Sequence, residues 1–75
     1  LLAVEVADSS LGRDLGEKQR AYARAGIPHY WVVDVDAQVT HAMSGPAAEG
    51  YQRRAVIPFA DPLAVPGTEE TIRLD

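Results

Sequence analysis

The chain has 75 residues, a formal net charge of −4 at pH 7 and no cysteine. A chain of this length forms one small domain at most, and without cysteine it holds neither a disulfide framework nor a thiolate metal site, which fits a reducing cytoplasm. The acidic balance argues against a broad basic surface for non-specific nucleic-acid binding, and no apolar run approaches the ~20 residues that span a bilayer.

The first half of the chain has the pattern of a strand, a helix and a second strand. Leu1 to Ala7 is a short apolar run with β-branched residues, typical of a strand buried on both faces. Apolar residues recur at helical spacing from Leu11 to Ala25, after the capping run "DSS" and before a glycine and a proline. His29 to Val35 is dense in aromatic and β-branched residues and predicts another strand. Short connections imply a right-handed crossover between two parallel strands.

The second half predicts mainly antiparallel structure. Its patterns indicate, in order, a turn at 34–38, a hairpin strand at 38–43, a loop from Ser44 to Gly50, a half-exposed strand at 51–57, an extended proline-rich stretch at 58–67 and a short last strand within 71–75.

Two charged residues occupy positions where this pattern favours apolar ones. Glu5 lies inside the first strand, and Lys18 lies near the centre of the apolar stripe of the helix, whereas the helical arginines gather on the opposite face. From the rise per residue of a strand, Glu5 lies about 10 Å from the turn that joins the strand to the helix. From the rise per residue of a helix, Lys18 lies about 12 Å from the same turn. Because the helix runs back along the strand, the spacing favours an ion pair between the two side chains.

The residues alone leave two interpretations of this pair open. A structural salt bridge contributes roughly as much to stability as hydrophobic side chains in its place would, because the cost of desolvating the charges offsets their attraction. Perturbed charged pairs occur both in structural networks and in active sites. The spacing therefore predicts the pair without assigning its role.

Ordinary structural roles account for the other candidate residues. No histidine lies near the two serines in sequence, the histidines lack metal-ligand spacing, and two aspartates flank the predicted turn. We therefore expect helix caps at Ser9 and Ser10, packed or hydrogen-bonded His29 and His41, turn-flanking Asp34 and Asp36, core positions for Tyr22 and Trp31, and a solvated face for Arg13, Arg20 and Arg24.

Taken together, the polar residues of the first half resemble a known signature. The run "EVADSS", then Asp14, Lys18 and Tyr22, and then "YARAGIPHYWVVD" is similar to the Uma2 family of restriction-endonuclease-like proteins, which belongs to the PD-(D/E)XK nuclease superfamily. The likeness is strong from Leu2 to about Val39 and looser from Gly50 onward. It implies a metal-dependent phosphodiesterase core whose lysine has moved from the strand onto the helix.

The resemblance also implies roles for individual residues. Glu5 would bind Mg²⁺, with the backbone carbonyl of Val6 as a second oxygen ligand, and Lys18 would hold the attacking water or offset charge on the phosphorane. The first acid of the superfamily would lie on a strand before this chain begins. Asp8 fits a helix cap, and Asp14 fits either an i,i+4 partner of Lys18 or an acid favoured by the helix dipole.

We therefore expect an α/β fold, a restriction-endonuclease-like core fragment in which a strand–helix–strand crossover precedes an antiparallel β meander. Residues 1–75 would form a single partial domain, the C-terminal part of the fold, with further N-terminal strands and a helix outside it. The expected function is Mg²⁺-dependent hydrolysis of nucleic-acid phosphodiester bonds, with DNA as the expected substrate, by a cytoplasmic full-length protein that contacts no membrane. The alternative is a non-catalytic module that retains the nuclease fold and assembles into homodimers or higher oligomers through exposed strand edges.

Overall fold

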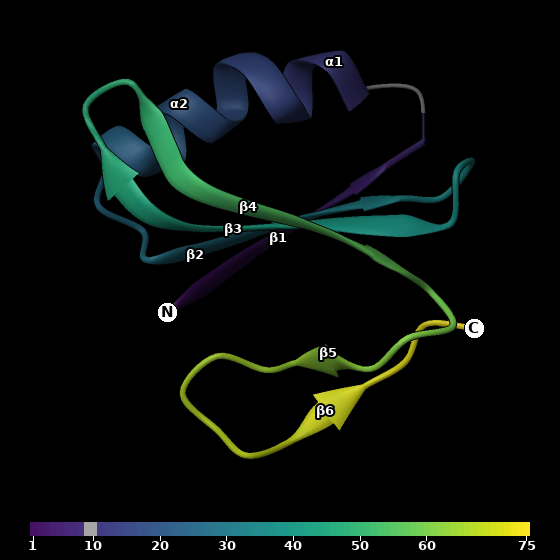
Figure 1. Cartoon of the computed structure of the whole chain (residues 1–75). Coiled ribbons are helices and arrows are strands. Elements are labelled where there is room, and N and C mark those ends of the chain that lie inside the picture. The colour runs from purple at the N-terminus through teal and green to yellow at the C-terminus, as the bar shows by residue number, and fades with distance from the viewer. Residues whose placement is uncertain (9–10) are drawn as a thin grey trace.

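One helical layer covers one face of a four-stranded sheet, and a small hairpin lies against the other face (Figure 1). The structure is a computed structural model that describes residues 1–8 and 11–75, so the caps predicted at Ser9 and Ser10 lie outside the described residues. The main sheet has the order β1 (Leu2–Ala7), β2 (His29–Asp34), β3 (Val39–Ala47) and β4 (Gly50–Pro58), and the hairpin consists of β5 (Leu63–Ala64) and β6 (Thr71–Ile72). The helical segment comprises α1 (Leu11–Arg13), η1 (Asp14–Lys18) and α2 (Gln19–Arg24).

The strand pairing confirms the predicted α/β topology. β1 and β2 are parallel and are joined by the helical segment, with Glu5 opposite Val32. β3 and β4 then continue the sheet by antiparallel pairing, as the predicted meander requires. Asp34 ends β2, and its Oδ1 accepts a hydrogen bond from the Ala37 backbone N–H at 3.2 Å, which confirms its expected turn role.

The hydrophobic core lies between the sheet and the helical segment. Tyr30 and Val32, which alternate along β2, are fully buried there beside Met43 of β3. The Tyr30 ring lies between two other aromatic rings, with centroids 4.9 Å from Tyr22 and 5.9 Å from Tyr51. Tyr22 therefore contributes to the core as the sequence predicts.

The helical segment departs from the regular helix predicted for Leu11 to Ala25. Its middle part, η1, has π-helical hydrogen bonding, and the most buried positions are Asp14, Gln19 and Ala23, while Ala25 is exposed. A π-turn accommodates one more residue than an α-turn. The buried positions are therefore five residues apart from Asp14 to Gln19 and four residues apart from Gln19 to Ala23. A constant 3.6-residue period therefore places Ala25 on the buried face and Asp14 at its edge, and both placements are wrong. The arginine stripe is exposed as predicted.

The predicted loop from Ser44 to Gly50 is largely strand. β3 continues to Ala47 and β4 begins at Gly50, which leaves a two-residue turn between them. The composition is typical of loops, yet a contact with the helix fixes this end of the sheet. The Gln19 side chain accepts a hydrogen bond from the Tyr51 N–H at 3.2 Å, and a Cβ built on Gly50, whose φ is +135°, would lie 2.8 Å from the Gln19 amide. Tertiary packing thus overrides the local signal.

The prediction that β1 is buried on both faces is also wrong for this chain. Val4 and Val6 point away from the helix and are 48% and 65% exposed. Among the described strands, β1 pairs with β2 alone, and the β5–β6 hairpin covers a different part of this face. The proline-rich stretch is extended only in part: Leu63–Ala64 forms β5, whereas residues 59–61 and 66–67 form turns and a bend, so the prediction of an extended stretch at 58–67 is wrong there. β6 supplies the short last strand. No helix within the described ranges has both the length and the hydropathy needed to cross a bilayer.

Candidate functional site

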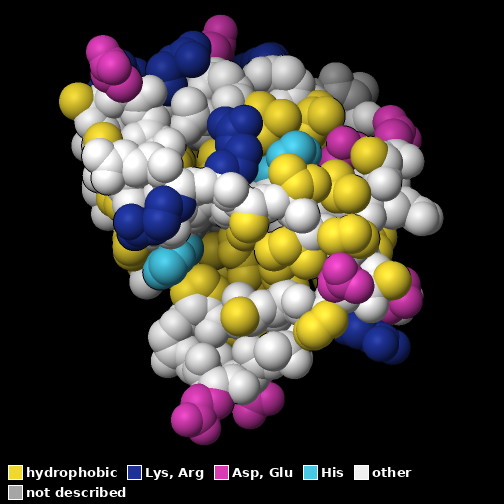
Figure 2. Space-filling model, in the orientation of Figure 1, with side chains coloured by type: hydrophobic (Ala, Val, Ile, Leu, Met, Phe, Trp, Pro, Cys, Tyr) yellow, Lys and Arg dark blue, Asp and Glu magenta, His cyan; other side chains and the backbone are white. Residues whose placement is uncertain are grey.

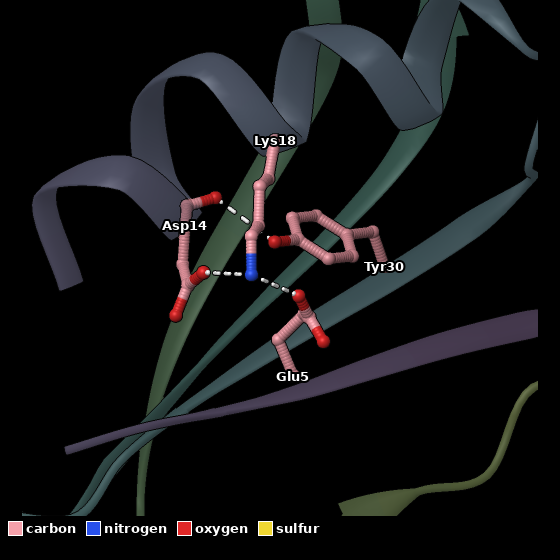
Figure 3. Close-up of polar contacts among 4 residues, drawn as sticks. All are labelled: Glu5, Asp14, Lys18 and Tyr30. Carbon is pink, nitrogen blue, oxygen red and sulfur yellow. Dashed lines mark hydrogen bonds and ion pairs between the residues drawn. The ribbon is translucent and has the colours of Figure 1, made fainter. Parts of the chain in front are cut away.

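The ammonium group of Lys18 lies between two carboxylates (Figure 3). Its Nζ is 2.7 Å from Glu5 Oε2, across the interface between strand and helix, and 3.2 Å from Asp14 Oδ1, one turn earlier in the same helical segment. The predicted meeting of Glu5 and Lys18 at equal depth is therefore confirmed. The structure adds Asp14 as a third member of the site and settles its geometry as an i,i+4 partner of Lys18.

Three elements fix these side chains in place. Glu5 alternates with Val4 and Val6 along β1 and so faces the helix. Lys18 ends η1, and helical side chains lean toward the N-terminus, which directs its Nζ toward Asp14 and Glu5. The hydroxyl of Tyr30 donates a hydrogen bond to the backbone carbonyl of Asp14 at 3.0 Å, so β2 anchors the π-turn from below (Figure 3).

Exposure rises steadily across the cluster. The Asp14 side chain is 1% exposed, Glu5 is 26% exposed and Lys18 is 39% exposed. Lys18 is thus only partly desolvated, less than expected from its place in the apolar stripe. The cluster has a buried side at Asp14 and an open side at which water or a phosphate group can reach both Lys18 and Glu5.

The electrostatic environment keeps Lys18 protonated. Hydrogen bonds to Glu5 and then to Asp14 raise the pKa of Lys18 above its ordinary value of 10.5, and burial opposes them without reversing the direction. An ammonium ion with a raised pKa is a donor and a positive charge at neutral pH rather than a base. Burial is also the main reason that the pKa of Tyr30 lies well above 10, with the nearby Asp14 carboxylate as the next cause, so its hydroxyl stays a neutral donor.

We expect the stability of the protein to fall at alkaline pH. Both Lys18 and Tyr30 have a folded-state pKa raised above the unfolded value, so their contributions are fully present below pH 10.0 and are lost as the pH rises through the folded values. Urea unfolding followed by tryptophan fluorescence from about pH 8 to about pH 12 should show this loss. In a Lys18→Met variant the decline should be smaller, and an equal decline in both proteins would contradict the assigned origin.

The oxygen atoms of the cluster suit a hard divalent cation. Mg²⁺ is usually bound through one or two carboxylates, with water and substrate phosphates completing its octahedron. Glu5 and Asp14 place one carboxylate on each side of the Lys18 ammonium group, and Glu5 is the more accessible of the two for a cation. Within residues 1–8 and 11–75, no group of three or more His, Cys, Asp and Glu side chains has the arrangement of a closed metal cage. The donor set therefore fits a site completed by solvent and substrate, and the Val6 carbonyl stays a predicted ligand.

The other sequence candidates lie outside the cluster. Trp31 is 5% exposed on the sheet face opposite the helix, a core position as predicted. His29 and His41 are partly buried, and neither takes part in an ion pair or metal-like group among the residues described. Sequence reasoning left the role of Asp14 open, although its four-residue spacing from Lys18 was the signal that could have assigned it.

The whole chain matches one family model. Residues 1–75 match the model of Uma2, whose description is "Putative restriction endonuclease". No curated protein and no solved structure matches the chain.

Proposed function

Because the chain belongs to the Uma2 family of restriction-endonuclease-like proteins, we propose that the full-length protein is a Mg²⁺-dependent endonuclease that cleaves DNA in the cytoplasm. The family itself supports a nuclease-like function with a divalent metal and a nucleic-acid substrate. The observation that carries the proposal is the position of the Lys18 Nζ, 2.7 Å from Glu5 and 3.2 Å from Asp14 at a partly open site.

The proposed roles follow from the charge and exposure of each residue. Glu5 would hold the cation through a carboxylate oxygen, with the Val6 carbonyl beside it. A bound divalent metal would polarise the phosphate and lower the pKa of its water. The protonated Lys18 would donate hydrogen bonds to the attacking water and to phosphate oxygens, where it stabilises developing negative charge. Asp14, buried below, would be a positioning residue that holds the ammonium in place.

A purely structural salt bridge explains this arrangement less well. Glu5, Asp14 and Lys18 carry a formal charge of −1 between them, and a pair kept for structure alone gains little over apolar packing. A divalent cation would offset the charge of the carboxylates. The partial exposure of Lys18 and Glu5 also supplies the access that a substrate needs, which a structural pair does not require.

The proposal is tested by nicking of supercoiled plasmid DNA with the full-length protein. We expect conversion to nicked and linear forms in Mg²⁺, complete loss of conversion after chelation with EDTA, and recovery when Mg²⁺ is restored in excess. Cleavage that persists in EDTA would contradict the metal dependence. A folded protein that cleaves neither DNA nor RNA in Mg²⁺ or Mn²⁺ would overturn the proposal and favour the assembly module.

A further inference from the structure

A groove lies on the side of the sheet away from the helix and from the Glu5–Lys18 cluster. It has a volume of about 760 Å³ and lies between the main sheet and the β5–β6 hairpin. Figure 2 shows it as a hollow with a hydrophobic floor, bordered by Lys or Arg and His side chains at one rim. Trp31, Ile57 and Leu63 contribute to its apolar lining. Because Leu63 is 3% exposed, the hairpin is packed onto the sheet and the groove is part of the fold.

The charge of this groove is opposite to that of the chain. The chain carries 11 acidic and 7 basic residues, yet the lining contains Arg53, Arg54 and His29 and no aspartate or glutamate. Within the described part of the chain, neither arginine has a carboxylate partner. Arg53 lies opposite Ser44 on the groove face of the sheet, whereas Arg54 lies opposite Met43, whose side chain faces the helix, so the groove is assigned the Arg53 guanidinium group alone. A groove that holds this group and has no carboxylate in its lining, in an otherwise acidic protein, is complementary to an anion.

The guanidinium group of Arg53 is held in place. Its Nε donates a hydrogen bond to Ser44 Oγ at 3.3 Å, and a Cβ built on Gly45 would lie 3.1 Å from Nη2, so the group rests against the glycine backbone. Gly45 has a φ of +69°, a conformation that favours glycine. The Ser44 contact occupies Nε and leaves the two terminal nitrogens to bind a ligand, a planar arrangement suited to phosphate.

We propose that this groove binds a nucleotide, with the base against the apolar floor and the phosphate on Arg53. The volume is within the range of small-ligand sites. A base and a ribose offer hydrogen-bonding groups to the Gln52 amide and the His29 ring of the lining, which a plain hydrocarbon anion does not. The groove lies on the opposite sheet face, so the proposal goes beyond the nuclease site and does not depend on it.

A nucleotide titration tests the proposal directly, and Trp31, which lines the groove, is a local probe of binding. Adenosine 5′-monophosphate is titrated into the full-length protein in EDTA, so that neither a metal nor cleavage takes part, and binding is followed by calorimetry and by Trp31 fluorescence where that signal is resolved. We expect saturable binding that is at least about tenfold weaker for adenosine or for inorganic phosphate alone, because each supplies half of the contacts.

Matched arginine variants assign the binding to the groove. Arg53→Gln should weaken nucleotide binding at least about tenfold, while Arg20→Gln, on the exposed face of the helix, should leave it unchanged. Both positions are exposed, and circular dichroism checks that both variants fold. The proposal is overturned if Arg53→Gln binds the nucleotide as tightly as wild type, or if binding does not saturate at millimolar nucleotide. It is also overturned if octanoate, an anion with a plain hydrocarbon chain, binds more tightly than the nucleotide, or if the protein self-associates and Arg53→Gln abolishes that self-association. If the protein binds the nucleotide but cleaves no DNA, the proposed nuclease function is contradicted and the proposed nucleotide site is not.

Discussion

Replacing Lys18 with methionine is expected to lower the rate of Mg²⁺-dependent DNA nicking by about 10²–10³-fold, the usual effect of removing a donor that stabilises transition-state charge. Methionine keeps much of the length and the apolar stem of the side chain while it removes the ammonium group that contacts Glu5 and Asp14. The measurement is a single-turnover nicking rate with saturating protein, which separates chemistry from DNA binding.

Two further variants distinguish a catalytic from a structural role of Lys18. Glu5→Gln should reduce the rate at least as strongly, because it removes the charge of the proposed metal ligand. Arg20→Met, which removes a cation from the solvent face of the same helix, should retain the wild-type rate. If Lys18→Met and Glu5→Gln both cleave like wild type while their unfolding free energies fall, the pair is a structural salt bridge and the site assignment is wrong.

Tyr30→Ala is expected to destabilise the protein by about 3–5 kcal/mol, the typical effect of deleting a large buried aromatic side chain. Tyr30 has no exposed surface, contacts the rings of Tyr22 and Tyr51, and bonds the backbone carbonyl of Asp14. Since native domains are stable by only about 5–15 kcal/mol, this loss removes a large share of the stability and should move the unfolding midpoint to a much lower urea concentration. Urea unfolding followed by Trp31 fluorescence measures the difference.

Tyr30→Phe isolates the contribution of the hydroxyl group. It preserves the ring and removes the 3.0 Å hydrogen bond to Asp14, which should cost about 0.5–1.5 kcal/mol. Because this bond anchors the π-turn that carries Lys18, the variant should also nick DNA more slowly while remaining folded. Equal stability of Tyr30→Ala and Tyr30→Phe would show that the ring is not the centre of the core.

The sequence predicts the ion pair well because two regular elements fix its geometry. The rise per residue of a strand and of a helix places Glu5 and Lys18 at the same depth, and the 2.7 Å contact confirms it. The π-turn alters this depth little, because one extra residue moves Lys18 along the helix axis by little more than an ångström. Parallel pairing of β1 with β2 follows from the short connections in the same way.

Features set by contacts between distant segments could not be predicted from local patterns. The burial of Asp14 depends on the π-turn and on the Tyr30 hydroxyl, which is 16 residues away in the chain. The extension of β3 through a Ser-Gly-Pro run depends on Gln19, which meets Tyr51 from a separate element. The groove exists because Leu63 packs onto the sheet, and nothing in the composition of the proline-rich stretch specifies that contact.

The most direct test of the site is Mn²⁺ binding to the full-length protein, measured by electron paramagnetic resonance for wild type, Glu5→Gln and Lys18→Met. Mn²⁺ takes the same oxygen ligands as Mg²⁺ and is visible to this method. We predict that Glu5→Gln weakens Mn²⁺ binding at least about tenfold, while Lys18→Met binds as tightly as wild type or more tightly, because the cation no longer competes with an ammonium for the Glu5 carboxylate. Equal Mn²⁺ affinity of wild type and Glu5→Gln would contradict a metal site at Glu5.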